Sequence, residues 1–245
     1  MNRISKTIKY ADLSLNPYPG CWGPGGTREK PNWCPYCYAR RRAEQYRGSK
    51  AWPNGFEPRA CLDRLEELGH LRQPSIIFMG DAGDLFGAWV PSEDIRFVLQ
   101  TTQVFRRHTY LFLTQNPTRL PEFNPWPSNC WIGVSATDAA TYFMAYHSLR
   151  GVEAKVKFLS MEPLLGTPLS GHLISASEVI QWLILGGLTG PGGRKSYPPV
   201  EWVEEIEAAA DKAGIPIWEK ENLTNRRPLR QEKPAERMKH DRDNS

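Results

Sequence analysis

The sequence lacks three features that would mark a membrane-spanning, exported or repeat protein. No apolar run approaches the roughly 20 residues that a membrane-spanning helix needs. The first fifteen residues, MNRISKTIKYADLSL, have neither the apolar core nor the small-residue cleavage site of a signal peptide. No unit repeats along the chain. We therefore expect a cytoplasmic protein that has no membrane partner.

Cysteine is scarce, with five residues among 245. Because the cytosol keeps thiols reduced, we do not expect a disulfide framework. Cys21, Cys34 and Cys37 nevertheless fall within seventeen positions, a clustering that is typical of a metal or redox site. Cys61 and Cys130 stand apart, and we expect both to be small buried residues.

A strong excess of one charge is also missing, since 31 basic and 27 acidic residues give a net charge of +4. Residues 28–59 differ from the rest, with eight basic and three acidic residues and a net charge of +5. Five aromatic residues lie among these charges: Trp33, Tyr36, Tyr38, Tyr46 and Trp52. This mixture suits contact with phosphates and stacking of bases, so a nucleic acid is a candidate partner. An ordinary solvated helix face with core aromatics explains the same pattern.

Continuous apolar runs alternate with helical patterns along the chain. The runs that predict strands are one within Ile8–Leu15, then Ile76–Met79, Tyr110–Leu113, Cys130–Val134, Val156–Ser160, Trp182–Leu185 and Ile215–Trp218. The predicted helices are the one after Cys37, then Pro91–Phe105 with Ser92 as N-cap, Ala139–Leu149, and Glu201–Ala213 closed by Gly214. Apolar strands separated by helices favour a parallel sheet that is covered on both faces.

The number of these units predicts an α/β fold, a full or partial parallel (β/α) barrel of about six or seven strands. We expect one domain over residues 1–221, with the cysteine loop near its N-terminus. Residues 222–245 are polar and charged without periodicity, which predicts a charged flexible tail.

Polar or glycine-rich segments follow the strands, where parallel α/β folds place their chemistry. The candidate cofactor-binding residues at these ends are Gly80, Asp81, Asp84, Ser135, Glu162, Gly186 and Gly187. Carboxylates suit an ammonium group, a hydroxyl or carboxylate can hold ribose hydroxyls, and glycines let a backbone approach a ligand.

Each candidate also has a purely structural explanation. The aspartates can form an Asx-turn, Ser135 can cap a helix with Asp138, and Glu162 can belong to a buried ion pair. Glu219 and Lys220 follow the last strand and are explained more simply as a solvated loop pair.

The cysteines themselves leave two metals open. Cys34 and Cys37 form a CxxC pair, which places two soft thiolate ligands on one metal or cluster. Three thiolates on a four-iron cluster leave one iron open to the amino and carboxylate groups of S-adenosylmethionine (SAM). A zinc site closed by a fourth ligand, such as Cys61, has similar weight from spacing alone.

Several motifs resemble a phage-associated family of unknown function that carries a radical-SAM-like three-cysteine motif. The matching segments are NPYPGC, CPYCYA, MGDAGDLFGAWVP, LTQNPTRL, WIGVS, SMEPLLG and GGLTGPGGRKSYP. The chain departs from the family where Gln115 and Leu188 stand in place of the common lysine and glutamate. The twelve residues between Cys21 and Cys34 also exceed the spacer of the radical SAM signature.

This resemblance implies a barrel of the radical SAM type and a 4Fe-4S cluster on Cys21, Cys34 and Cys37. It implies that Tyr36 lies near the adenine of SAM and that the Gly80–Asp84 turn binds the methionyl amine. The implied activity is reductive cleavage of SAM to start radical chemistry, with electrons from a reductant such as flavodoxin or ferredoxin. A nucleic acid is the leading candidate substrate, and the alternative is a non-catalytic nucleic-acid-binding protein stabilised by zinc or a cluster.

Overall fold

The computed structural model describes residues 2–3, 8–167, 177–190, 194–224 and 227–234. The chain divides into two compact units. The N-terminal unit comprises Met1–Val134 and Gly151–Lys155, and the C-terminal unit comprises Ser135–Arg150 and Val156–Ser245. The single domain over residues 1–221 stays a prediction. Within the described part of the chain, no helix is long and apolar enough to cross a membrane.

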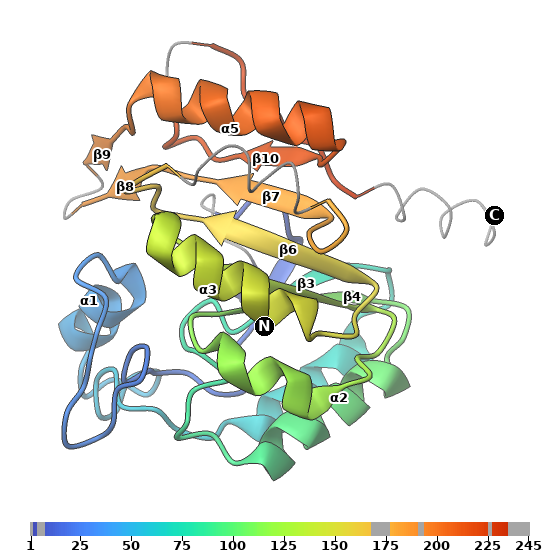
Figure 1. Ribbon diagram of the computed structural model, residues 1–245. Coiled ribbons are helices and arrows are strands. Elements are labelled where there is room, and N and C mark those ends of the chain that lie inside the picture. The colour runs from blue at the N-terminus through green and yellow to red at the C-terminus, as the bar shows by residue number, and fades with distance from the viewer. Residues whose placement is uncertain (1, 4–7, 168–176, 191–193, 225–226, 235–245) are drawn as a thin grey trace. The chain divides into compact units, whose positions relative to one another are not determined.

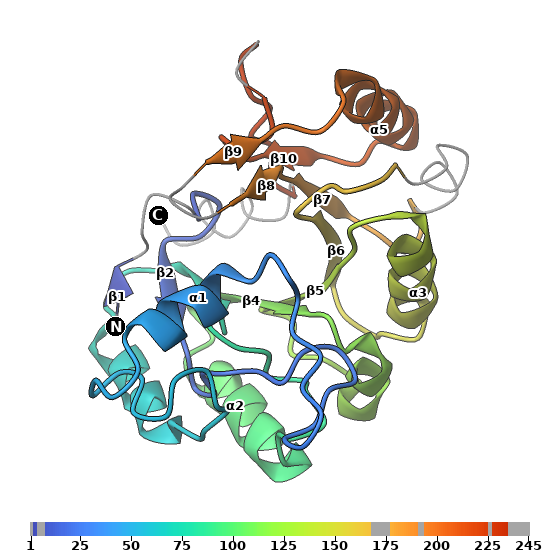
Figure 2. The same ribbon diagram turned by 90° about the vertical axis from the view of Figure 1, so that its left-hand side faces the viewer.

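Strands of the N-terminal unit pair in the order β1, β2, β3, β4, β5 (Figures 1 and 2). Their bounds are Asn2–Arg3, Leu13–Leu15, Ile76–Met79, Thr109–Thr114 and Cys130–Ser135. The strands β2 to β5 run parallel, and only the short β1 pairs antiparallel with its neighbour. Because parallel neighbours share a direction, the chain segments that follow β2, β3 and β4 leave the sheet at the same edge.

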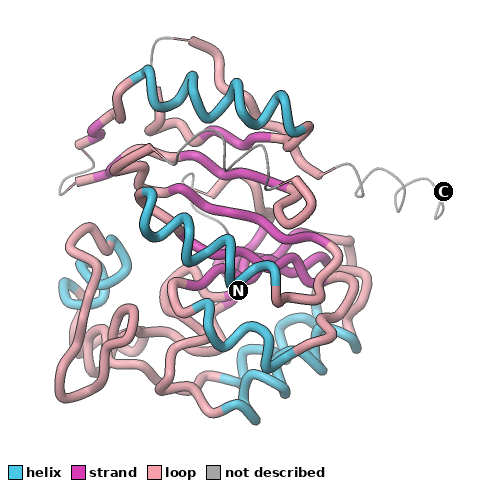
Figure 3. Tube along the Cα trace, viewed as in Figure 1, coloured by secondary structure: helices cyan, strands magenta, loops and turns pink. Residues whose placement is uncertain are grey.

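Helical segments connect these strands, as Figure 3 shows in cyan. They are α1 (Tyr38–Gln45), the 3-10 helices η1 (Leu62–His70) and η2 (Pro117–Phe123), and α2 (Ser92–Val104). The helix α2 buries Ile95, Val98 and Leu99, spaced as one helix face requires. The predicted Ser92 cap is wrong: Pro91 holds the N-cap position, and the Ser92 hydroxyl accepts a hydrogen bond from Arg119 at 2.9 Å.

In the C-terminal unit, β6 (Val156–Met161), β7 (Trp182–Leu185) and β10 (Ile217–Glu219) pair in that order and run parallel. The helices α3 (Ala139–Arg150) and α5 (Val200–Ala213) belong to the same unit. A two-stranded hairpin of β8 (Leu188–Thr189) and β9 (Lys195–Ser196) follows β7. The carboxyl ends of β6, β7 and β10 therefore lie side by side.

Residues 227–234, here called the return segment, run back along β10. An antiparallel bridge joins Gln231 to Trp218, and the Glu232 N–H donates to the Ile217 carbonyl at 2.9 Å. The indole N–H of Trp182 donates to the Glu232 carbonyl at 2.9 Å. These bonds occupy backbone groups that β10 would otherwise leave unpaired at the sheet edge.

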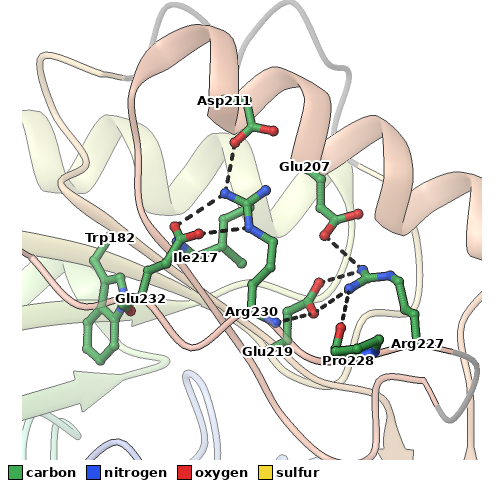
Figure 4. Close-up of polar contacts among 9 residues, drawn as sticks. All are labelled: Trp182, Glu207, Asp211, Ile217, Glu219, Arg227, Pro228, Arg230 and Glu232. Atoms are coloured by element: carbon green, nitrogen blue, oxygen red, sulfur yellow. Dashed lines mark hydrogen bonds and ion pairs between the residues drawn. The ribbon is translucent and has the colours of Figure 1, made fainter.

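Charged side chains fasten the return segment to β10 and α5 (Figure 4). The Arg227 guanidinium donates to both oxygens of Glu219, at 2.8 and 2.7 Å, and to Glu207 at 2.8 Å. Arg230 donates to Asp211 at 2.8 Å. The prediction of a flexible tail from residue 222 is therefore wrong for 227–234, because buried Glu219 binds this segment; residues 235–245 lie outside the described residues.

Candidate functional site

The cysteine loop of the N-terminal unit curls back on itself between Cys21 and Cys37. The Asn32 N–H donates to the Trp22 carbonyl at 2.7 Å, and the Trp33 indole donates to the Cys21 carbonyl at 2.7 Å. Gly23 has a φ of +85°, and a Cβ there would lie 1.8 Å from the Asn32 carbonyl oxygen. Glycine is thus required where the two arms of the loop approach each other.

Cys37 begins the helix that follows the loop. It is the N-cap of α1, and its sulfur accepts the Arg40 N–H at 3.3 Å. Cys21 accepts the Gly23 N–H through its sulfur at 3.1 Å. Two of the three predicted ligands therefore already receive backbone N–H donors, an arrangement that stabilises negative sulfur at a helix N-terminus and around iron–sulfur clusters.

The three thiols lie within electrostatic reach of one another. Burial is the largest cause that raises the pKa of Cys21, followed by the Asp84 carboxylate, while Cys37 and Cys34 add smaller increases. The pKa of Cys34 is raised by burial and then by Cys37, whereas hydrogen bonds with Gln115 and Tyr36 lower it. Burial also raises the pKa of Cys37, against the Arg40 and Ala39 N–H groups. A ligand that binds all three as thiolates must therefore displace their protons.

Asp84 joins the segment after β3 to the segment after β4. Its carboxylate accepts from the Thr114 hydroxyl at 2.7 Å, the Gln115 N–H at 3.0 Å and the Asn116 amide at 2.9 Å. The Phe86 N–H donates to it at 3.0 Å, which closes the Asx-turn that the sequence offered as the structural alternative. Asp84 is only 6% exposed. Its carboxylate is therefore enclosed by the protein groups that donate hydrogen bonds to it.

The segment that Asp84 organises in turn contacts the cysteine loop. The Cys34 thiol donates to the Gln115 side-chain oxygen at 3.1 Å, and the Gly25 N–H donates to the Asn116 side-chain oxygen at 3.2 Å. Gln115 stands where the resembling family carries lysine, and here it touches a predicted cluster ligand. Asp84 therefore positions the end of β4 against Cys34.

The Gly80–Asp84 turn is fixed from two directions. Asn16, after β2, donates to the Asp81 carboxylate at 2.5 Å and accepts the Ala82 N–H at 2.8 Å. The Tyr38 hydroxyl donates to the Asp81 carbonyl at 2.6 Å. The turn needs small residues, because a Cβ on Gly83 would lie 2.4 Å from the Tyr18 carbonyl oxygen. The structure brings the ends of β2 and β3 together with the start of α1.

An open cavity of about 260 Å³ lies beside the CxxC pair. Its lining residues are Cys34, Pro35, Cys37, Arg40, Arg41 and Glu44. The Arg40 guanidinium lies 4.0 Å from the centre of the Trp33 ring, and its Nε atom is buried without a hydrogen-bond partner. The lining of the cavity thus includes two cysteines, two arginines and one glutamate.

In the C-terminal unit, the predicted residues gather at the carboxyl ends of β6, β7 and β10. Glu162 follows β6 and forms an ion pair with Lys220, which follows β10. A Cβ on Gly186 would lie 2.9 Å from the Glu162 Cγ atom. The Asn222 side chain donates to the Gly187 carbonyl at 2.6 Å. The ion pair that the sequence offered as an alternative for Glu162 is present.

Ser135 ends β5, but it does not cap the next helix together with Asp138. The Asp138 carboxylate accepts the Thr141 N–H at 2.9 Å and its hydroxyl at 2.7 Å, so Asp138 alone performs the capping. The same hydrogen bonds from Thr141 lower the pKa of Asp138. Ser135 is half-buried at the strand end, and its contact with a cofactor stays a prediction.

Sequence reasoning missed three residues that hold the strand ends in place, Asn16, Asn116 and Asn222. The solvated loop pair expected at Glu219 and Lys220 is wrong, because Glu219 is fully buried against Arg227 and Lys220 binds Glu162. The only available signal for Asn16 and Asn116 was position, since both follow predicted strands.

The donor chemistry of the cysteine loop fits an iron–sulfur cluster. The loop carries three half-buried thiols, and two of their sulfurs accept backbone N–H groups. Among the described residues, no three or more His, Cys, Asp or Glu side chains are grouped to hold a single metal ion. Cys61 is buried and accepts an Arg59 guanidinium N–H at 2.8 Å. Cys130 is fully buried, 3.3 Å from the Thr102 hydroxyl.

Solved structures of spore photoproduct lyase share this fold. One, complexed with dinucleoside spore photoproduct, has a TM-score of 0.53 and 10% identity over 85% of this chain and 63% of that one. A mutant form with bound AdoMet, which is SAM, and dinucleoside spore photoproduct has a TM-score of 0.56 and 11% identity. That match covers 98% of this chain and 73% of the other. The predicted parallel α/β fold is confirmed, because these structures share it.

The chain spans less than two thirds of the first of these structures, 63% of its length. The model of the DUF5131 family, described as a protein of unknown function, matches residues 5–241 of this chain. No curated protein matches.

Proposed function

We propose that this chain, which belongs to the DUF5131 family of proteins of unknown function, is a radical SAM-type iron–sulfur enzyme. The observation that carries the proposal is the gathering of Cys21, Cys34 and Cys37 in one loop beside the ends of β3 and β4. The fold gives independent support, because a similar structure holds AdoMet together with a dinucleoside photoproduct. A nucleic acid is the substrate class that this likeness and the charge of residues 28–59 favour.

Cys21, Cys34 and Cys37 would hold a 4Fe-4S cluster and leave one iron open to SAM. The chemistry supplied by such a cluster, when bound, is one-electron reduction of the SAM sulfonium, with the electron drawn from a reductant such as flavodoxin or ferredoxin. The chain's own part is to bind, orient and exclude water. The N–H groups of Gly23 and Arg40 donate to two of the ligand sulfurs, which favours their thiolate forms.

The remaining predicted residues have separate tasks in this proposal. Tyr36 lies in the CxxC turn, where it would meet the adenine, and the Gly80–Asp81 part of the turn offers carbonyl and carboxylate oxygens to an ammonium group. Asp84 is a positioning residue, because its carboxylate holds the end of β4. In the C-terminal unit, Ser135, Glu162, Gly186 and Gly187 are the candidates for the ribose hydroxyls.

The test is a direct assay of the full-length protein. It is purified without oxygen, its iron and sulfide are measured, and it is then reduced and given SAM. We expect about four irons and four sulfides per chain, as a 4Fe-4S cluster contains, and release of 5′-deoxyadenosine. Cys34→Ala should lose both the cluster and the 5′-deoxyadenosine, because the two remaining thiolates cannot hold a cluster that needs three protein ligands.

Cys61→Ser provides the matched control, since it changes a cysteine outside the loop. The enzyme proposal expects this variant to keep iron, sulfide and 5′-deoxyadenosine formation. The competing function is the sequence-based alternative, a nucleic-acid-binding protein stabilised by zinc with Cys61 as a fourth thiolate, although Cys61 is buried and accepts a hydrogen bond from Arg59. Zinc in the anaerobic protein, lost in both Cys34→Ala and Cys61→Ser, would support that competitor and overturn the enzyme.

A further inference from the structure

The helix α1 has two unlike faces. Ala39 and Ala43, four residues apart, are buried against Phe56 in a small core that includes Cys21 and Cys37. Tyr38 and Tyr46 are 53% and 51% exposed, although they are large aromatic residues. Because residues four apart lie on the same side of a helix, exposed Arg42 falls between the two tyrosines. The helix thus presents a stripe of Tyr38, Arg42 and Tyr46, here called the α1 stripe.

The tyrosine at the start of the stripe is held in place. The Tyr38 hydroxyl donates to the Asp81 carbonyl at 2.6 Å, so the ring is anchored at its tip while about half of the residue stays exposed. An anchored ring loses little conformational freedom when a flat group stacks on it. Stacking on such rings is worth about 1–3 kcal/mol per base in proteins that bind single strands.

The positive charge around the stripe is not neutralised by ion pairs within the segment, because pairing two of the three acidic residues in 28–59 with arginines leaves the net charge at +5. Glu57 pairs with Arg28 at 3.1 Å, and Glu44 accepts from the Arg47 Nε atom at 2.8 Å. Six basic residues then stand against one acidic residue in this segment. Two of the six, Arg40 and Arg41, line the cavity beside the CxxC pair.

We infer that the α1 stripe binds a single-stranded nucleic acid, with bases stacked on Tyr38 and Tyr46 and a phosphate on Arg42. Arg40 and Arg41 would take a neighbouring phosphate at the cavity, which brings the strand beside Cys34 and Cys37. The inference rests on the proposed function, whose substrate class it narrows to an unpaired strand. Duplex is disfavoured because its bases are stacked on each other and present no free face to a tyrosine.

The experiment measures fluorescence anisotropy of a labelled mixed-sequence 20-mer with the full-length, anaerobically prepared protein. The single strand should bind more tightly than the matching duplex. Tyr46→Ala should weaken binding by roughly 5- to 150-fold, as the loss of one stacked base does. Arg42→Ala should lower the slope of log affinity against log salt by about 0.7, the value for one phosphate contact on a single strand.

Phe97→Ala and Arg106→Ala are matched controls, since they remove an exposed aromatic residue and an exposed cation from another part of the N-terminal unit. They should bind the strand as the wild type does. Equal affinity of Tyr46→Ala and wild type, or binding of anionic vesicles in place of the oligonucleotide, would overturn the inference. Wild type that cleaves SAM but ignores the strand rejects only this inference, whereas strand binding through Tyr46 without iron and sulfide rejects only the proposed enzyme.

Discussion

Single residues show how the C-terminal unit handles two neighbouring carboxylates. Glu219 is completely buried, and it remains ionised because Arg227 donates to both of its oxygens and the Arg230 N–H donates to one. Glu207 contacts the same guanidinium from α5. Burial, the largest cause, and the nearby Glu219 raise the pKa of Glu207 to about 7. The pKa of Glu219 lies below its usual value, because its bonds with Arg227 outweigh its burial.

The pKa of Glu207 is raised and that of Glu219 is lowered, so the two groups make stability depend on pH in opposite directions, each in its own pH range. Glu207 binds its proton more tightly when folded, so its contribution is complete below the ordinary glutamate pKa of about 4.3 and is lost as pH rises toward 7. Glu219 contributes above the ordinary value and loses its contribution as pH falls below it. We predict that wild type unfolds at lower urea at pH 7.5 than at pH 5.5.

Glu207→Gln isolates the first effect, because it removes the titrating group and keeps a similar shape. The variant should lose most of the difference between the two urea midpoints, which circular dichroism at 222 nm follows. Glu204→Gln, a charge change on an exposed position of the same helix, is the control and should keep that difference. An unchanged difference in Glu207→Gln would contradict the assignment of the raised pKa.

For single residues, the sequence predicted which side chains have ligand chemistry better than it predicted which side chains touch each other. The three cysteines were visible because thiol type and spacing carry the signal themselves. The partners of Gln115, Glu162 and Glu219 were not visible, because each lies elsewhere along the chain: Cys34 in the cysteine loop, Lys220 after β10 and Arg227 on the return segment. Glu162 meets Lys220 only because β6, β7 and β10 are neighbours.

Elements were predictable where burial made the pattern continuous. The strands β3 and β7 match their predicted bounds, since every residue in each is buried and reads as an uninterrupted apolar run. The short strands β1, β8 and β9 have no such run, and η1 carries charged residues among its leucines. At α2 the N-cap was misplaced by one residue, and the Ser92 hydroxyl that was expected to cap the helix accepts a hydrogen bond from Arg119, which is distant in sequence.

The end of α5 permits a prediction about one element. Gly214 holds the left-handed conformation at φ +66°, and a Cβ there would meet no atom within 4 Å. Substitution therefore tests backbone strain without a steric clash. Gly214→Ala should lower the free energy of unfolding by about 1 kcal/mol. Gly214→Asn, whose side chain tolerates this conformation, should lose clearly less, and urea titration measures both. Equal losses would mean that the conformation is not the cause.

For the whole molecule, the contribution of the return segment is open to test. It covers the outer edge of β10 and supplies Arg227 to buried Glu219. A chain that stops at Thr224 should unfold at a lower urea concentration. The buried carboxylate left without its partner should alone lower the free energy of unfolding by about 3 kcal/mol. The truncated chain should also associate more at high concentration, since an open strand edge accepts other chains. Light scattering measures the association.

A chain that stops at Pro234 is the matched control, because it keeps the segment and its ion pairs. Equal loss of stability in both truncated chains would show that the return segment is not what stabilises the unit. The fold as a whole was foreseeable because alternating apolar strands and helices have few arrangements. The pairing of the return segment with β10 was not foreseeable, because a polar, aperiodic sequence does not indicate whether a strand pairs with it.

The return segment also sets an order of events during synthesis. Glu219 and β10 emerge from the ribosome before Arg227 and the strand-like residues that follow it. Until those residues emerge, the nascent C-terminal unit holds a carboxylate without its cation and a sheet with an open side. The N-terminal unit, which contains the cysteine loop, is translated almost entirely earlier. The cysteine loop is therefore complete on the nascent chain before the second unit is.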